Sequence, residues 1–435
     1  MKNEGHIYLP AGAGERMQYF SLQFNDCTIR FVLHYPGLLD AACLLKATRA
    51  VIDGAEILHA SFIPGNIKSQ WQVHNDYEDS SCFQHIKTDD DPLDVALAYA
   101  LQPVPEHEKT QFRCCLAQNG SSSAVSINIS HLCVDGGDGR YLAAKLAEAY
   151  SRIKATGNCE GLHIKNGSRS AEQVYRNLSL PKFLALLKSP FSATKSIVPL
   201  PSQEAGEPRI VTRIISAQTM NAARQQAKQD SATTNDLLLA ACYHAYAGIP
   251  GVDAAAPASI VSMMDLRRHC IGGDSPGLAN MSGTMITLLP NGISQSFETT
   301  LAEIALQTAA AKGDPLSGLV GLPLLHTAVR RLPMKALLFA AQKVYKNMAL
   351  GLTNPGNSQA SQFSMDALLP DMLVFGGPCK MKPSVQISAI SLENTCTLSI
   401  IGNYTEADAA LFRSLLENME NSLLHYIKKA PSKGV

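Results

Sequence analysis

Hydrophobic and polar positions divide the first half of the chain into short strands and helices. Runs of β-branched and aromatic residues predict strands, and apolar residues spaced three to four apart predict helices. The clearest hairpin joins residues 111–116 to 124–130 across Gln118-Asn119-Gly120-Ser121, because Asn-Gly is a strong turn signal. The other segments predict strands at 28–34, 57–63 and around Trp71, and helices at 38–52, 92–101 and 139–153.

The second half of the chain repeats this mixture. A second hairpin, 385–391 with 396–401, leads to a final helix that Thr405 caps, with Asp408 as its capping-box partner. Each half therefore contains a hairpin leading into a long helix, which predicts two lobes of mixed α/β structure. The remaining patterns predict strands at 209–215, 258–264 and 284–290, and helices at 217–228, 234–247, 297–311 and 324–348.

A proline-rich stretch with little periodicity separates the two halves. Residues 189–206 include Pro190, Pro199 and Pro201, a composition typical of a linker. We therefore predict an N-terminal lobe at 1–188, a linker at 189–206 and a C-terminal lobe at 207–435. The length of 435 residues agrees with two cores, because single cores seldom grow beyond about 300 residues.

Composition excludes some classes of function. The chain has 37 Lys+Arg and 37 Asp+Glu residues, a balance that argues against bulk nucleic-acid binding. Its 11 cysteines are scattered without a CxxC pair, which favours reduced thiols over disulfides or a metal site. The N-terminus lacks the apolar region of a signal peptide, and no apolar stretch is long enough to span a bilayer, so we expect a cytoplasmic protein.

The candidate chemistry lies directly after the strand predicted at 124–130, in His131-Leu132-Cys133-Val134-Asp135-Gly136-Gly137. A strand end can present an imidazole to a cleft, and glycines behind Asp135 allow a tight turn with positive φ. That turn could fold the carboxylate beneath the histidine. The carboxylate could then fix the tautomer of His131, or pair with a cation and brace the turn. Residue types alone leave a structural histidine and a catalytic one both open.

Family resemblance narrows this choice. His131, Asp135 and Gly136 match the HxxxDG motif shared by chloramphenicol acetyltransferase, plant BAHD acyltransferases, mycobacterial Pap-type acyltransferases and nonribosomal peptide condensation domains. The chain resembles this superfamily in further segments that follow in the same order, so the resemblance covers essentially its whole length. These segments are 53–62 with Trp71, 233–241, Asp265-Leu266-Arg267-Arg268 and Gly277-Leu278-Ala279-Asn280.

The resemblance implies a fold and a set of roles. Two chloramphenicol acetyltransferase-like lobes, each an α+β sandwich, would enclose a central tunnel with His131 near its middle. His131 would be the general base. Asp135 would form a salt bridge with Arg267 of the other lobe, with Arg268 as the second choice, and Gly136 would allow close backbone approach.

The resemblance also implies the reaction partners. An acyl group would pass from a coenzyme A thioester or a phosphopantetheinyl carrier protein to the hydroxyl or amine of a small molecule, in secondary metabolism. No bound cofactor, metal or second copy of the chain is required, so we expect a monomer. The BAHD segment DFGWG is missing, and we take Asn280, Ser282 and Thr284 as candidate residues for substrate and oxyanion binding.

Two alternatives stay open. Peptide-forming condensation domains usually carry a second histidine where this chain has Ser130, which favours simple ester or amide formation over a stand-alone condensation domain. A catalytically silent binding module of the same fold is the other alternative, although silent members usually lose the histidine that is present here.

Three further features of the sequence are not assigned a catalytic or binding role. We predict a plain loop at Gly12-Ala13-Gly14-Glu15, since it lacks the Lys-Ser/Thr of a phosphate loop. Cys133 is interpreted as a packing residue and not a nucleophile, because nothing predicts a base oriented toward it. Arg209 and Arg213 alternate along a strand, which favours a solvated face over a coenzyme A phosphate site.

Overall fold

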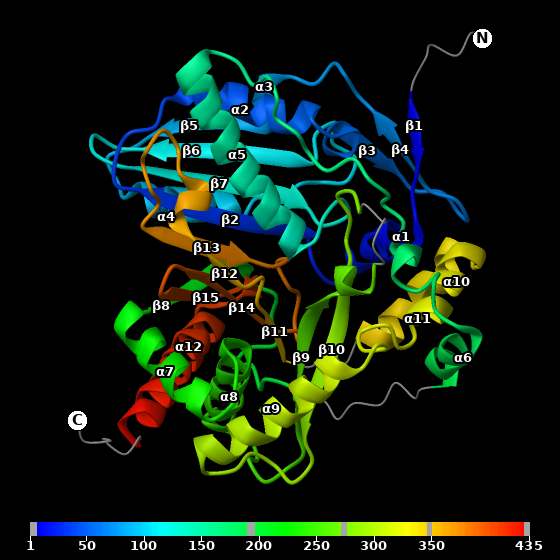
Figure 1. The fold of residues 1–435 in the computed structure, drawn as a ribbon, viewed down its shortest axis with the longest axis vertical. Coiled ribbons are helices and arrows are strands. Elements are labelled where there is room, and N and C mark those ends of the chain that lie inside the picture. The colour runs from blue at the N-terminus through cyan, green and yellow to red at the C-terminus, as the bar shows by residue number, and fades with distance from the viewer. Residues whose placement is uncertain (1–6, 189–195, 271–275, 346–349, 430–435) are drawn as a thin grey trace.

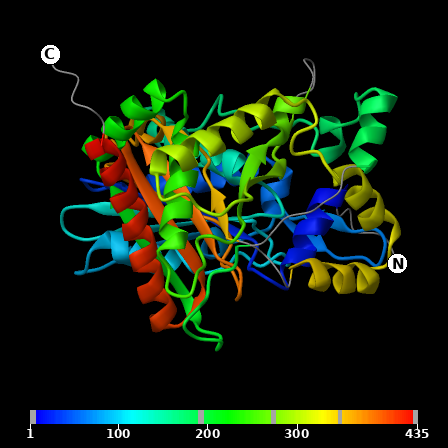
Figure 2. The same cartoon turned by 90° about the horizontal axis from the view of Figure 1, so that it is seen from below.

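The computed structural model describes residues 7–188, 196–270, 276–345 and 350–429. Figure 1 shows two bodies, one above the other, each built on a β-sheet with helices packed against it. Figure 2 shows that helices α1, α10 and α11 group at one end of the molecule, away from the C-terminal helix α12. The predicted class of mixed helices and mixed sheets is confirmed.

A five-stranded sheet with strand order β13-β2-β7-β6-β5 forms the centre of the first body. β2 is buried on both faces because its side chains alternate: Phe31 and Leu33 contact one hydrophobic cluster and Val32 another. Helices α2 and α5 supply the first cluster and α4 the second. The elements are β2 (Thr28–Tyr35), β5 (Phe83–Lys87), β6 (Phe112–Gln118), β7 (Ser123–Ser130), β13 (Met372–Gly376), α2 (Ala41–Asp53), α4 (Pro92–Ala100) and α5 (Gly136–Thr156).

The fifth strand of this sheet comes from the far end of the chain. β13 pairs antiparallel with β2, from Met372 opposite His34 to Gly376 opposite Arg30. The sequence pattern gave no sign of this crossover. The lobe boundaries remain a prediction: residues 196–206 contain no helix or strand, and residues 189–195 of the predicted linker lie outside the described residues.

A seven-stranded sheet forms the centre of the second body, in the order β10-β9-β11-β14-β15-β8, with β12 paired to β14. Helices α7, α8, α9 and α12 cover it. The strands are β8 (Glu207–Ile215), β9 (Ala258–Asp265), β10 (Ser282–Leu289), β11 (Gly351–Thr353), β12 (Asn357–Ser358), β14 (Gln386–Leu392) and β15 (Thr395–Tyr404). The helices are α7 (Ala217–Gln229), α8 (Thr234–Ala247), α9 (Phe297–Gly313) and α12 (Glu406–Lys429).

A small sheet and several helices complete the described chain. The small sheet has the order β1-β4-β3. Its strands are β1 (Tyr8–Pro10), β3 (Ala60–Ile63) and β4 (Gln70–Val73), and the remaining helices are α1 (Ala13–Ser21), α3 (Asp79–Cys82), α6 (Leu180–Lys188), α10 (Leu322–Arg331) and α11 (Met334–Tyr345).

Three sequence predictions need correction. The strand predicted at 57–63 begins with a 3-10 turn over Glu56–His59, and only Ala60–Ile63 pairs as β3. The helix predicted at 324–348 is two helices, because Pro333 cannot continue the first of them. The predicted loop at Gly12–Glu15 instead opens α1, where the Gly12 N–H donates to Glu15 Oε2 at 2.8 Å.

Gly139, on the first turns of α5, sets how closely this helix approaches the sheet. A Cβ atom at this position would lie 2.7 Å from Ile29 Cδ1 and 2.7 Å from Phe31 Cε2. Gly139→Val should therefore destabilise the protein by about 1–3 kcal/mol, because the added methyl groups overpack the core. Urea unfolding would measure the loss. Gly120→Ala is the control, since a Cβ there meets nothing within 4 Å, and an equal effect of both variants would contradict the prediction.

Candidate active site

His131 occupies the first position after β7, half-buried between the end of that strand and the start of β2. Its backbone N–H donates to the carbonyl of Cys27 at 2.7 Å, and the N–H of Ser130 donates to Gln111 O at 2.9 Å. Backbone hydrogen bonds therefore fix both Ser130 and His131, independently of any contact that the imidazole makes. The prediction that a strand end presents this residue is confirmed.

The imidazole of His131 is held in one tautomer by the backbone. Nδ1 lies 2.6 Å from the carbonyl oxygen of Val134. A carbonyl oxygen can only accept, so we assign the ring proton to Nδ1, which leaves a lone pair on Nε2. Of the two roles that the sequence left open for Asp135, fixing the tautomer of His131 is not the one observed, because Val134 supplies that contact. An imidazole in this state can take a proton at Nε2.

The surroundings of His131 favour its neutral form. Burial lowers the pKa of the imidazole below its ordinary value, while the bond to Val134 O and the charge of Asp135 raise it. The positive charge of Lys380, from the segment between β13 and β14, lowers it further. The net result is a lowered pKa, so the imidazole is neutral at neutral pH.

Asp135 faces a cation and not the histidine. Its Oδ2 accepts from Arg267 Nη1 at 2.8 Å and from the N–H of Met281 at 2.8 Å. Arg267 Nη2 donates to Asp138 Oδ2 at 2.7 Å, and its Nη1 also lies 3.1 Å from Asp265. Arg267 therefore joins the turn after β7 to the segment before β10. Arg268, the second choice, lies elsewhere and donates to Lys312 O at 2.6 Å.

Asp138 belongs to this cluster, and the sequence reasoning missed it. Asp138 is 1% exposed. Its Oδ2 also accepts the N–H of Ala279 at 2.9 Å, and its Oδ1 pairs with Lys165 at 3.1 Å. Asp135 is the N-cap of α5 and accepts the Asp138 N–H at 3.0 Å. An acidic residue three positions after an acidic cap was the available signal.

The glycines behind Asp135 do not form the positive-φ turn that the sequence predicted. Neither Gly136 nor Gly137 has positive φ, because both belong to the first turn of α5. The predicted positive-φ turn is therefore wrong. A Cβ on Gly136 would lie 3.2 Å from Phe375 Cζ on β13, so the residue allows close approach of α5 to that strand.

Of the three candidate substrate-binding residues, Asn280 is the one brought to His131. Its Nδ2 donates to the carbonyl oxygen of His131 at 3.4 Å, and its Oδ1 accepts the N–H of Ser282 at 3.2 Å. Nδ2 also lies 3.3 Å from His131 Nδ1. Because the ring proton is assigned to Nδ1, both atoms are donors and this contact is not a hydrogen bond. Ser282 and Thr284 are exposed residues of β10, and no described hydrogen bond joins their side chains to His131.

Helix α1 is joined by hydrogen bonds and an ion pair to the segments on either side of His131. Arg169 connects it to the histidine turn: Nη2 pairs with Glu15 at 3.0 Å, and Nη1 donates to Cys133 O at 3.2 Å. The Sγ of Cys27 donates to Gln18 O at 3.0 Å. Because α1 was predicted as a loop, the sequence reasoning did not place it beside His131.

Alternative chemistries near His131 find little support. Burial raises the pKa of the Cys133 thiol to about 12, so it carries no thiolate at neutral pH. None of the cysteines is paired in a disulfide. Within the described ranges, no cluster of three or more His, Cys, Asp or Glu side chains could hold a metal ion. The described part of the chain also has no helix that is both long and apolar enough to cross a bilayer.

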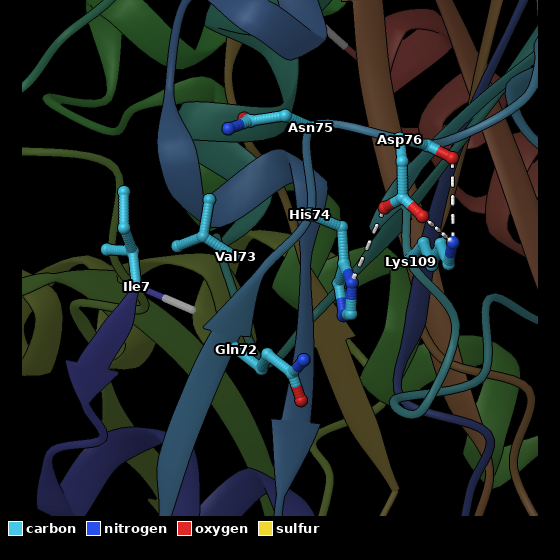
Figure 3. Close-up of a pocket in the computed structure, with 7 residues that line it drawn as sticks. All are labelled: Ile7, Gln72, Val73, His74, Asn75, Asp76 and Lys109. Atoms are coloured by element: carbon cyan, nitrogen blue, oxygen red, sulfur yellow. Dashed lines mark hydrogen bonds and ion pairs between the residues drawn. The ribbon is translucent and has the colours of Figure 1, made fainter. Parts of the chain in front are cut away.

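A surface pocket of about 470 Å³ lies at the end of β4, and its lining contains none of the predicted site residues. Figure 3 shows Asp76 between His74 and Lys109, with an ion pair of 2.6 Å to the lysine and a longer contact of 3.9 Å to the histidine. The residues that line the pocket are Ile7, Gln72, Val73, His74, Asn75, Asp76 and Lys109.

Arg209 and Arg213 are engaged in surface ion pairs. Arg209 lies 2.8 Å from Glu406, and Arg213 lies 2.6 Å from Glu420. These contacts agree with the solvated face that the sequence favoured.

No family model and no curated protein sequence matches the chain. Solved structures do. TRI3 trichothecene 15-O-acetyltransferase from Fusarium sporotrichioides aligns with a TM-score of 0.69 and 13% identity, covering 97% of each chain. The first condensation domain of the CDA synthetase aligns with a TM-score of 0.69 and 14% identity, covering 96% of each chain.

A third match is the starter condensation domain of rhizomide synthetase, in complex with C8-CoA. It has a TM-score of 0.65 and 14% identity over 96% of this chain and 95% of the other. At these identities the likeness concerns the fold. This chain has, over nearly its whole length, the fold shared by this acetyltransferase and these condensation domains, which confirms the fold that the resemblance implied.

Proposed function

We propose that this chain is an acyltransferase in which His131 is the general base. The observation that carries the proposal is the 2.6 Å contact between His131 Nδ1 and Val134 O, which leaves Nε2 as a proton acceptor. Asp135, Arg267 and Gly136 hold the turn that presents the ring. Sharing a fold with an acetyltransferase and condensation domains supports acyl transfer as the reaction class.

The chemistry needs one base and no covalent enzyme intermediate. Nε2 takes the proton of an attacking hydroxyl or amine as that atom bonds to the carbonyl carbon of a thioester. The carbonyl electrons move to oxygen, return as the C–S bond breaks, and the thiolate leaves with the proton from His131. General-base help of this kind contributes about 10²–10⁴-fold. Asn280, Ser282 and Thr284 remain the candidates for binding substrate and oxyanion.

The donor is proposed to be a coenzyme A thioester or an acylated carrier protein, and the acceptor a small-molecule alcohol or amine. The solved complex of a neighbour with C8-CoA supports a thioester donor. Ser130 in place of a second histidine favours esters or simple amides over peptide bonds. We further propose that the chain acts as a monomer in the cytoplasm, with a tunnel between its two lobes.

A thiol-release assay tests this function directly. The purified chain is mixed with acetyl-, octanoyl- and benzoyl-CoA or the matching acylated carrier proteins, and with a panel of alcohols and amines. We expect free thiol to appear only when an acceptor is present. If instead no donor or acceptor gives product, while a partner protein alone raises the melting temperature by binding the folded state, the silent binding module is favoured.

The acid limb of the pH–rate profile should lie below pH 6.5. His131 must be neutral to act, and burial holds its pKa below the ordinary value. The midpoint of the decline in kcat/KM should therefore lie below pH 6.5. kcat/KM is the quantity to measure, because it reports the pKa of the free enzyme before a substrate anion is bound. An acid limb centred above pH 7 would contradict the assignment of His131 as a buried neutral base.

A further inference from the structure

Lys380 is held in place by its backbone, in the crossover between β13 and β14. It forms an antiparallel bridge with Asn25. Its N–H donates to Ile401 O at 3.2 Å, and its carbonyl accepts from Asn403 at 2.9 Å. The next residue, Met381, donates to Phe24 O at 2.9 Å. The side chain of Lys380 therefore begins from a fixed point on the junction of the two bodies.

This fixed point lies beside the base. Asn25, the bridge partner of Lys380, is two residues from Cys27, and the carbonyl of Cys27 accepts the His131 N–H at 2.7 Å. The preceding residue, Cys379, donates its N–H to Asp26 Oδ1 at 2.9 Å. Burial lowers the pKa of His131 and the charge of Lys380 lowers it further; burial raises the pKa of the Cys27 thiol and the charge of Lys380 opposes that rise. Both effects agree with this placement.

The ammonium of Lys380 has no hydrogen-bond or ion-pair partner among residues 7–188, 196–270, 276–345 and 350–429. The nearest acid along the paired segment, Asp26, is already bonded to the guanidinium of Arg30. Lys382 shows the contrast: it pairs with Asp408 at 2.6 Å and donates to Ser202 O at 2.9 Å. Burial lowers the pKa of Lys380, as expected for a cation removed from water.

The charge of Asp26 acts on Lys380, but Asp26 is bonded to Arg30, so Lys380 shares this counter-charge and has no direct partner. A half-buried cation in this position is unfavourable unless a further anion compensates it. A role as an oxyanion hole fits poorly, because such donors are preorganised and nothing bonded to the Lys380 ammonium fixes it. A flexible point charge is better suited to holding an anion that arrives with the ligand.

We propose that Lys380 binds an anionic group, a carboxylate or a phosphate, of the molecule that occupies the His131 site. The two sources of this anion are an acidic acceptor and the phosphates of the donor. The proposal rests on the proposed function only in taking that molecule to be a substrate. It names a substrate class, negatively charged near the reacting atoms, that the sequence did not indicate.

Binding of matched probes to Lys380→Met, Lys380→Arg and the natural chain tests this proposal. The probes are 3-hydroxybutyrate and 3-hydroxybenzoate with their methyl esters, and acetyl-CoA with acetyl-pantetheine, which lacks its phosphates. We expect Lys380→Met to raise the Kd of the anionic member of one pair by about 10- to 100-fold and to leave the neutral member unchanged. Lys380→Arg should retain most of the affinity. The affected pair identifies carboxylate or phosphate as the anion.

Two readouts separate this role from a structural one. Without ligand, Lys380→Met should keep or raise the melting temperature, whereas loss of a structural lysine would lower it. By NMR of the labelled histidines, Lys380→Met should raise the pKa of His131, because burial still lowers it but the positive charge of Lys380 no longer does. In the natural chain, a bound anion should raise it likewise.

Equal affinities of all probes for the natural chain and Lys380→Met would overturn the proposal, and so would a fall in the melting temperature of the unliganded variant. Neither readout depends on turnover. A chain that binds an anion through Lys380 but releases no thiol would therefore disprove the proposed function alone.

Discussion

His131→Ala should fold like the natural chain and lose turnover by about 10²–10⁴-fold. The loss is expected because Nδ1 keeps its proton in a hydrogen bond to Val134 O, so Nε2 is the ring atom that can accept a proton. The fold should survive because the sheet holds this position by its backbone: the His131 N–H donates to Cys27 O whatever the side chain is. Thiol release measures the turnover, and circular dichroism with a melting curve checks the fold.

His107→Ala is the matched control, since this histidine is exposed and lies in a loop before β6. It should retain full activity. Affinity for the thioester donor should change little in His131→Ala, so the loss should appear in kcat. Full activity in His131→Ala would remove the base from the mechanism. A loss confined to KM would assign the residue to binding instead.

Local patterns predicted the elements that local physics decides. Asn119-Gly120 marked the hairpin that carries His131, and the structure pairs β6 with β7 across it. Arg267 came from family resemblance, because no local rule joins it to Asp135 across 132 positions of the chain. The pairing depends on how two bodies meet, which periodicity does not encode.

Features missed in the sequence share this long-range origin. β13 pairs with β2 although more than three hundred residues separate them. The backbone of Lys380 pairs with Asn25, two residues from the carbonyl that bonds to His131, only because that crossover returns the chain to the first body. The tautomer of His131 depends on a carbonyl oxygen, which every residue has, so no residue type could have marked Val134 for this role.

Arg267→Met should destabilise the protein by about 3–5 kcal/mol, the second large effect. The substitution keeps an apolar stem but leaves Asp135 and Asp138, which are 2% and 1% exposed, without their shared cation. Lys165 still contacts Asp138 at 3.1 Å, but Asp135 has no second lysine or arginine among the described contacts. Urea or thermal unfolding at neutral pH would measure the loss.

The pH dependence of this loss distinguishes a stranded charge from lost packing. Burial and the charge of Asp135 already raise the pKa of Asp138, and Arg267 opposes that rise. Without Arg267, the folded-state pKa of Asp138 should exceed the unfolded value still further, so stability falls as pH rises through the unfolded and then the folded pKa. Arg267→Met should therefore be more damaging at pH 7 than at pH 4, and adding Asp138→Asn should restore part of the stability. A loss of stability that is independent of pH and unchanged by Asp138→Asn would mean that Arg267 acts through packing. The turn that presents His131 would then not be held by the charge of Arg267.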